Sequence, residues 1–145
     1  MRLFLMWGTG YPKVGDLIAE LRKSHQIIYW IGRTRDRKEK SSETVFHDYF
    51  EAYEGKPAKG VDTSTFDPPG EHLIKSLRDT EAVILTMMNK HFDWMCVDER
   101  RHLYFSMLRY WYGVLKQYKP DLIIFRTVPH GVFDYLIYEL AKMFN

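Results

Sequence analysis

Four short runs of consecutive apolar residues stand out along this chain of 145 residues. Each run is continuous and does not alternate with polar positions, a pattern typical of strands that are buried on both faces of a parallel sheet. We therefore predict four strands, over Leu3 to Trp7, Gln26 to Ile31, Ala82 to Thr86 and Asp121 to Phe125.

The segments between these runs repeat their apolar residues at helical spacing. Val14, Leu17, Ile18 and Leu21 follow one another at intervals of three and four, which predicts a helix that begins near Pro12. Four further helices are predicted, over Ser42 to Tyr53, Pro69 to Arg78, Asp98 to Tyr118, and from Gly131 onward.

Strands and helices that alternate in this way predict an open, mostly parallel sheet with helices on both faces, a Rossmann-like α/β/α arrangement in three layers. The length favours a single domain over residues 1–145. Gly113 lies inside the longest predicted helix, where glycine costs on the order of 1 kcal/mol relative to alanine, so we expect close packing there. Glu54 to Pro68 shows no periodicity and is expected to be either an ordinary surface loop or a functional one.

Composition excludes several classes of protein. Lys plus Arg is 21 and Asp plus Glu is 19, so the net charge of +2 gives no electrostatic case for a nucleic-acid partner. No apolar run approaches the roughly 18 residues that a membrane span needs. The lone Cys96 cannot form an internal disulfide and favours a reducing compartment, so we expect the protein in the cytoplasm.

In open α/β sheets, ligands bind beyond the carboxyl ends of the strands. Gly8 and Gly10 follow the first strand and let a ligand or a neighbouring loop approach the backbone. The dinucleotide-binding pattern of glycines is incomplete, because Lys13 stands at the third glycine position. Arg33 follows the second strand and suits the 2′-phosphate of NADP, although its basic neighbourhood equally suits a solvated loop.

The segment after the fourth strand carries the most informative chemistry. Arg126 and Thr127 are candidates for holding a substrate anion, and His130 is a candidate general base at the start of the last helix. Asp134, one helical turn beyond His130, is a candidate orienting group or favours the helix N-terminus. The alternative for His130 is a helix-capping role. His91 and Asp93 lack a third ligand, so no metal site is predicted.

Both ends of the chain resemble the N-terminal half-domain of capsule and surface-polysaccharide biosynthesis proteins, which are similar to GT-B glycosyltransferases. The resemblance lies in the glycine-rich turn after the first strand and in the succession Lys-Pro-Asp, Leu-Ile-Ile-Phe, Pro-His-Gly and Leu-Ala-Lys toward the C-terminus. It implies a domain that holds a saccharide acceptor, with Gly8, Gly10 and His130 facing the cleft. Trp7 and Tyr11 are expected to be able to stack on sugar faces.

The resemblance also implies what this chain lacks. In such glycosyltransferases a C-terminal domain holds the nucleotide-sugar donor, and no such domain follows here. We therefore expect a fragment, or a partner chain that supplies the donor domain, and no catalysis by this chain alone. Such a protein would work in the cytoplasm or at the inner face of the membrane.

Two other functions remain open. The first is a stand-alone Rossmann domain that binds a nucleotide such as NADP through Arg33. The second is a non-enzymatic interaction module whose aromatic helix, Leu103 to Tyr118, docks a partner.

Overall fold

The computed structural model describes residues 1–10 and 13–144. The chain forms two compact units, one built from residues 1–61 and 117–128, the other from residues 62–116 and from 129 onward. No helix within the described ranges is both long enough and apolar enough to cross a membrane.

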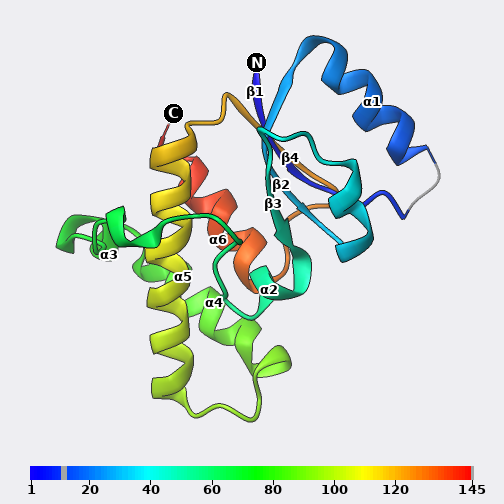
Figure 1. Ribbon diagram of the computed structural model, residues 1–145. Helices are drawn as coiled ribbons and strands as arrows, with labels where there is room; N and C mark the ends of the chain where they lie inside the picture. Colours follow the sequence, from blue (N-terminus) through cyan, green and yellow to red (C-terminus); the bar gives the residue numbers. More distant parts are fainter. Residues whose placement is uncertain (11–12, 145) are drawn as a thin grey trace. The chain divides into compact units, whose positions relative to one another are not determined.

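The first unit contains a sheet of four parallel strands (Figure 1). All neighbouring strands pair in parallel, in the order β3-β2-β1-β4. The predicted open, parallel, Rossmann-like α/β fold is thereby confirmed. The strands are β1 (Arg2–Met6), β2 (Gln26–Gly32), β3 (Val45–Asp48) and β4 (Leu122–Phe125).

Helix α1 (Val14–Ser24) joins β1 to β2 and covers one face of the sheet. Its apolar positions recur at helical spacing, so that Val14 and Ile18 are buried on the same side. They pack against the side chains that alternate onto this face of the strands. The resulting core cluster consists of Leu3, Leu5, Val14, Ile18, Ile27, Trp30 and Phe46.

Aromatic rings fill the opposite face of the same sheet. Phe4 alternates away from α1, and its ring centroid lies 4.7 Å from that of Tyr29. Tyr118 packs edge-on against Tyr29 with centroids 5.6 Å apart. Much of the aromatic content of the unit is therefore core packing, because rings in these arrangements combine a large buried area with favourable edge-to-face contact.

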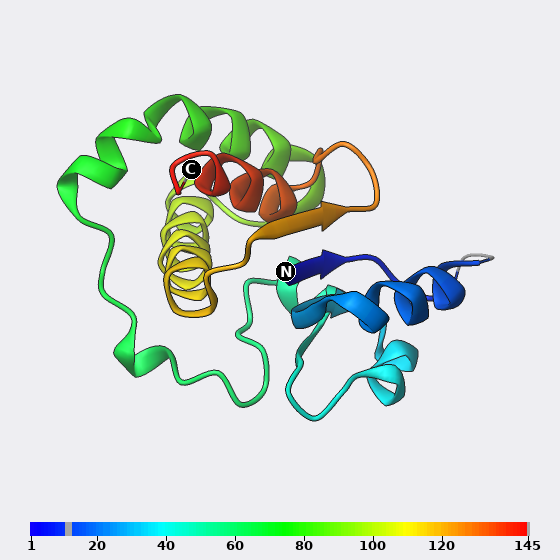
Figure 2. The ribbon, with the colours of Figure 1, turned by 90° about the horizontal axis from the view of Figure 1, so that it is seen from above.

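The second unit is helical. It comprises the short 3-10 helix η2 (Thr63–Thr65), α3 (Glu71–Ser76), α4 (Arg78–His91), most of α5 (Val97–Tyr118) and α6 (Val132–Ala141). Helix α6 packs beside α4, as Figure 2 shows. Trp111 of α5 stacks on Phe133 of α6 with centroids 6.1 Å apart, and both side chains are buried.

The close packing expected at Gly113 is present. A Cβ atom at this position would collide with the ring of Phe66, which is only 5% exposed. The glycine therefore lets a residue of the irregular Glu54–Pro68 segment lie directly on the backbone of α5, which offsets its low helix propensity.

The strand predicted over Ala82 to Thr86 is wrong, because these residues lie within α4. A short apolar run fits a buried strand or a buried helix equally well. The residues on either side distinguish the two, because Thr80, Ile84 and Met88 are buried at intervals of four and lie on one face of a helix. His91 is consequently the last residue of α4 and Asp93 follows that helix, so neither residue follows a strand.

The helix predicted over Ser42 to Tyr53 is also wrong in its first half. Val45–Asp48 forms strand β3, which pairs with β2, and only Tyr49–Tyr53 is helical, as α2. Asp48 ends the strand and caps the helix, accepting a hydrogen bond from the backbone N–H of Phe50 at 2.9 Å. Pairing with β2 is a long-range interaction that local periodicity does not register.

Candidate ligand site at the carboxyl edge of the sheet

The glycine turn after β1 is shaped by neighbouring side chains. A Cβ on Gly8 would lie 2.9 Å from Oδ2 of Asp36, and the guanidinium of Arg35 occupies the space that a side chain on Gly10 would need. Of the two predicted reasons for these glycines, close approach of a neighbouring loop is therefore present, and approach of a ligand stays a prediction. Tyr11, the predicted sugar-stacking residue, lies outside the described residues.

Asp36 holds this turn to the segment that follows β2. Its side chain is 0% exposed and accepts hydrogen bonds from the backbone N–H of Thr9 at 3.1 Å and from the Thr9 hydroxyl. Its second oxygen accepts from the backbone N–H of Arg33 at 2.7 Å. The carboxylate lies within η1 (Thr34–Glu39), three residues beyond Arg33. Because it is fully engaged with the protein, it is not available to a ribose.

Arg33 projects over two aromatic rings at the same edge. Its guanidinium carbon lies 5.2 Å from the ring centroid of Tyr49 and 4.7 Å from that of Phe50. These rings are 39% and 53% exposed, and Arg33 itself is exposed. A planar cation held over partly exposed rings is a surface on which another flat, electron-rich group can stack. We call Arg33, Tyr49 and Phe50 the stacking cluster.

Asp48 fixes the position of the stacking cluster through its hydrogen bonds. Thr34 donates its hydroxyl to Oδ2 of Asp48 at 2.6 Å. Burial by itself would raise the pKa of Asp48, but hydrogen bonds from Thr34 and from backbone N–H groups, with the charge of Arg37, hold the pKa below its ordinary value. Asp48 is therefore ionised at neutral pH and fixes the start of α2, which carries both rings.

The end of β4 lies beside the end of β1. The backbone N–H of Arg126 donates to the carbonyl of Met6 at 3.3 Å, and Arg126 and Thr127 are both exposed. The strand order reverses at β1, since β2 and β3 lie on one side of it and β4 on the other. Such a reversal is where ligands bind in open α/β sheets, and the Gly8 turn and Arg126 both lie there.

His130 and Asp134 belong to the second unit. The backbone N–H of His130 donates to Oδ2 of Asp134 at 3.4 Å, and a Cβ on Gly131 would lie 3.0 Å from Oδ1. The carboxylate thus sits at the N-terminus of α6, where it interacts favourably with the helix dipole. A base role for His130 and an orienting role for Asp134 stay predictions.

One polar group that sequence reasoning missed is His47. It is 0% exposed, with Nδ1 2.8 Å from the hydroxyl of Tyr29 and Nε2 2.8 Å from the carbonyl of Lys56. Because a carbonyl only accepts, Nε2 carries the proton and Nδ1 accepts from Tyr29. Burial lowers the pKa of His47 from 6.5 to about 4. The predicted helix over Ser42 to Tyr53 gave no reason to expect His47 in a buried strand. No pattern in the neighbouring residues indicates that this histidine is buried.

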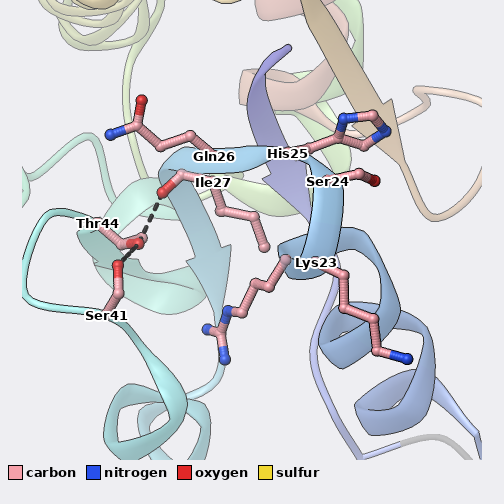
Figure 3. Close-up of a pocket in the computed structure, with 8 residues that line it drawn as sticks. Lys23, Ser24, His25, Gln26, Ile27, Ser41 and Thr44 are labelled. Atoms are coloured by element: carbon pink, nitrogen blue, oxygen red, sulfur yellow. Dashed lines mark hydrogen bonds between the residues drawn. The ribbon is translucent and has the colours of Figure 1, made fainter.

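A cavity of about 390 Å³ lies at the opposite, amino edge of the sheet (Figure 3). Ser41 and Thr44 are linked at 2.7 Å, and Thr44 donates to the carbonyl of Ile27 at 2.7 Å. Lys23 is already paired with Glu20 at 2.6 Å. None of the predicted site residues lines this cavity. Those residues were chosen because ligands of open α/β sheets bind beyond the carboxyl ends of the strands, whereas this cavity lies at the amino ends.

The described residues contain no cluster of three or more potential metal-ligating His, Cys, Asp or Glu side chains. Comparison with protein-family models, with curated proteins and with solved structures gives no match to this chain.

Proposed function

We propose that this domain binds a phosphate-bearing nucleotide at the carboxyl edge of its sheet, of the NADP type suggested by Arg33. The observation that carries the proposal is the stacking cluster beside the Gly8 turn. The base would stack on the exposed rings and guanidinium, while Arg33 also supplies the donors that a phosphate accepts.

Further charges at this edge favour an anion. Arg35 lies on the Gly10 backbone and Arg37 lies over the ring of Phe46 at 5.4 Å, both within η1. Asp36, which lies between them in the sequence, is buried and accepts hydrogen bonds from three donor groups, whereas Glu39 is the exposed carboxylate of η1. The exposed charge of the segment is thus predominantly positive, which attracts phosphate groups.

The turn differs from the usual dinucleotide-binding turn at the start of α1. Lys13 occupies the N-cap with φ 67°, a left-handed conformation that glycine adopts more easily. Lys13 therefore holds a backbone conformation that is unfavourable for a residue with a side chain. The third glycine of the usual turn permits close packing of the helix on the strand, which a lysine does not, so we infer that phosphate binding here depends more on side chains than on the turn.

Isothermal titration calorimetry with NADPH, NADH and a UDP-sugar tests the proposal. We expect NADPH to bind more tightly than NADH, because only NADPH carries the 2′-phosphate. The variant Arg33→Lys keeps the charge but loses the planar stacking surface, and should weaken NADPH binding about tenfold. Lys38→Met, which removes an exposed charge from the same segment, is the matched control and should change binding less. Absence of binding by all three ligands would overturn the proposal.

The acceptor-side role in a surface-polysaccharide glycosyltransferase is a second proposal. It is supported by the exposed Arg126 and Thr127 at the strand reversal, where an anionic saccharide would meet a guanidinium and a hydroxyl. An acidic oligosaccharide should then stabilise the chain in a thermal-shift assay, and Arg126→Met should abolish the effect. Stabilisation by NADPH alone would contradict this role.

A further inference from the structure

The cavity at the amino edge of the sheet is formed by residues of the first unit alone. It is lined by residues 22–27, where α1 ends and β2 begins, and by Ser41 and Thr44, which precede β3. Its volume of about 390 Å³ lies toward the lower end of the roughly 300–1,000 Å³ that small-molecule sites occupy. This volume suits a ligand smaller than the dinucleotide proposed for the opposite edge.

The side chains around the cavity favour an anion. None of the described residues that line it is a carboxylate, and three of them are basic: Arg22, Lys23 and His25. The nearby carboxylates already have partners. Glu20 pairs with Lys23 at 2.6 Å, and Glu43 accepts a hydrogen bond from the Gln26 amide at 2.9 Å. The charge of Arg22 is therefore the one to account for.

Arg22 is held in place without being neutralised. Its Nη2 donates to the backbone carbonyl of Glu39, and its guanidinium carbon lies 5.5 Å from the ring centroid of the buried Trp30. Neither partner carries a negative charge, and within the described ranges Arg22 pairs with no carboxylate and its Nε has no acceptor. A guanidinium fixed in one orientation with donors unused is preorganised to bind a phosphate or carboxylate.

The C-terminus of α1, which ends at this cavity, opposes an anion, because its last carbonyl groups carry a partial negative charge. Two features offset this effect. Arg22 and Lys23 both lie in the last turn of the helix, and the backbone N–H of His25 donates to the carbonyl of Leu21 at 2.9 Å. The local charge is thus set by the basic side chains rather than by the helix end.

The hydroxyl groups of Ser41 and Thr44 can only accept hydrogen bonds from a ligand. Thr44 donates its proton to the carbonyl of Ile27 at 2.7 Å, so Ser41 must be the donor in the 2.7 Å contact between the two hydroxyls. Ser41 is exposed, and its oxygen keeps lone pairs for a ligand donor. In Figure 3 these hydroxyls lie on the side opposite the Lys23 side chain. The cavity therefore offers donors for an anion and acceptors for a hydroxyl.

We propose that this cavity binds a sugar phosphate, a ligand that combines an anion with hydroxyl donors. The phosphate accepts hydrogen bonds from Arg22, and a sugar hydroxyl donates to Ser41. Lys40, whose ammonium lies 3.5 Å from the carbonyl of Ser41, adds positive charge beside the cavity. The site does not depend on the proposed nucleotide site, because it lies at the other edge of the sheet and uses different residues.

Isothermal titration calorimetry with glucose 6-phosphate, inorganic phosphate and glucose tests this site. We expect glucose 6-phosphate to bind most tightly, inorganic phosphate more weakly, and glucose without measurable heat. Arg22→Met should weaken the binding of both phosphates about tenfold. Lys59→Met removes an exposed positive charge elsewhere in the first unit and should leave binding unchanged. Equal binding of glucose and glucose 6-phosphate, or no effect of Arg22→Met, would overturn the proposal.

A second variant covers the case in which loss of the Arg22 contacts unfolds the chain. Ser41→Ala, at an exposed position, should weaken glucose 6-phosphate about fivefold and change inorganic phosphate little, because only the sugar donates to Ser41. In the wild type, glucose 6-phosphate should shift the amide NMR signals of residues 22–27 and 41–44. Shifts confined to residues 33–37 and 48–50, at the carboxyl edge, or no binding at all, would overturn the proposal.

Discussion

The buried carboxylate of Asp36 accepts a hydrogen bond from the backbone N–H of Thr9 at 3.1 Å, although the two residues are 27 positions apart. This contact joins the turn after β1 to the segment after β2. Both segments flank the proposed nucleotide site, so the position of the site depends on one buried charge whose hydrogen bonds replace its lost hydration.

Removing this carboxylate should destabilise the chain. Asp36→Ala leaves the N–H groups of Thr9 and Arg33 without their acceptor, and we expect a loss of about 3 kcal/mol in the free energy of unfolding, measured with urea. Thr9→Val removes only the hydroxyl donor and should cost about 1 kcal/mol. Asp93→Ala, at an exposed aspartate, is the control and should have little effect. Equal losses for Asp36 and Asp93 would contradict the bracing role.

His47 should make stability depend on pH. Its pKa is about 4 in the folded chain and 6.5 in the unfolded chain, so between these values only the unfolded chain takes up the proton. The free energy of unfolding should therefore fall as pH is lowered from 6.5 toward 4, by about 3 kcal/mol in total from this residue.

Urea titrations at several pH values measure this contribution. His47→Gln keeps a polar side chain but cannot take up the proton, so it should flatten the slope of stability against pH in this window. His102→Gln, at an exposed histidine of α5, should leave the slope as in the wild type. Parallel slopes for the wild type and His47→Gln would exclude the assigned role.

Gly113 and Phe66 should be energetically coupled. Gly113→Ala improves helix propensity by about 1 kcal/mol, but its methyl group collides with the Phe66 ring, so we expect net destabilisation by about 1–3 kcal/mol. In a Phe66→Ala background the collision is gone, and the same Gly113→Ala change should stabilise. A double-mutant cycle of unfolding free energies measures the coupling, and additive effects would rule out the contact.

Arg109 should order the residues before α3 more than the nearby ion pair does. Its guanidinium donates to the carbonyl of Phe66 at 2.9 and 3.1 Å, whereas Lys116 and Asp67 form an ion pair with 47% and 74% exposed side chains. Arg109→Met should speed amide hydrogen exchange in residues 62–67, and Lys116→Met should change it little. The reverse order of effects would show that the ion pair holds this segment.

Local pattern was sufficient for much of the architecture. The apolar runs of β1, β2 and β4 and the stripes of α1, α5 and α6 were predicted correctly, because burial imposes a period that the sequence itself displays. The close packing at Gly113 was also predicted, because glycine within a helix lowers stability unless another group packs closely against the backbone there.

The errors arose where one pattern fits two structures. Ala82 to Thr86 was assigned to a strand because a five-residue apolar run does not distinguish a strand from a helix. The β3 strand was missed because its formation depends on pairing with β2, whose partner residues lie 16 positions away in the sequence, and local periodicity does not report such pairing.

The sequence by itself determined the class of fold, the glycine turn, and the presence of Arg33 and Arg126 after their strands. Only the tertiary structure decided what these residues contact: that Asp36 reaches back to Thr9, that Arg33 lies over Tyr49 and Phe50, and that β4 pairs with β1. The physical reason is that periodicity reports which face of an element is buried, whereas hydrogen bonds, ring stacking and strand order depend on segments that meet only after the chain has folded.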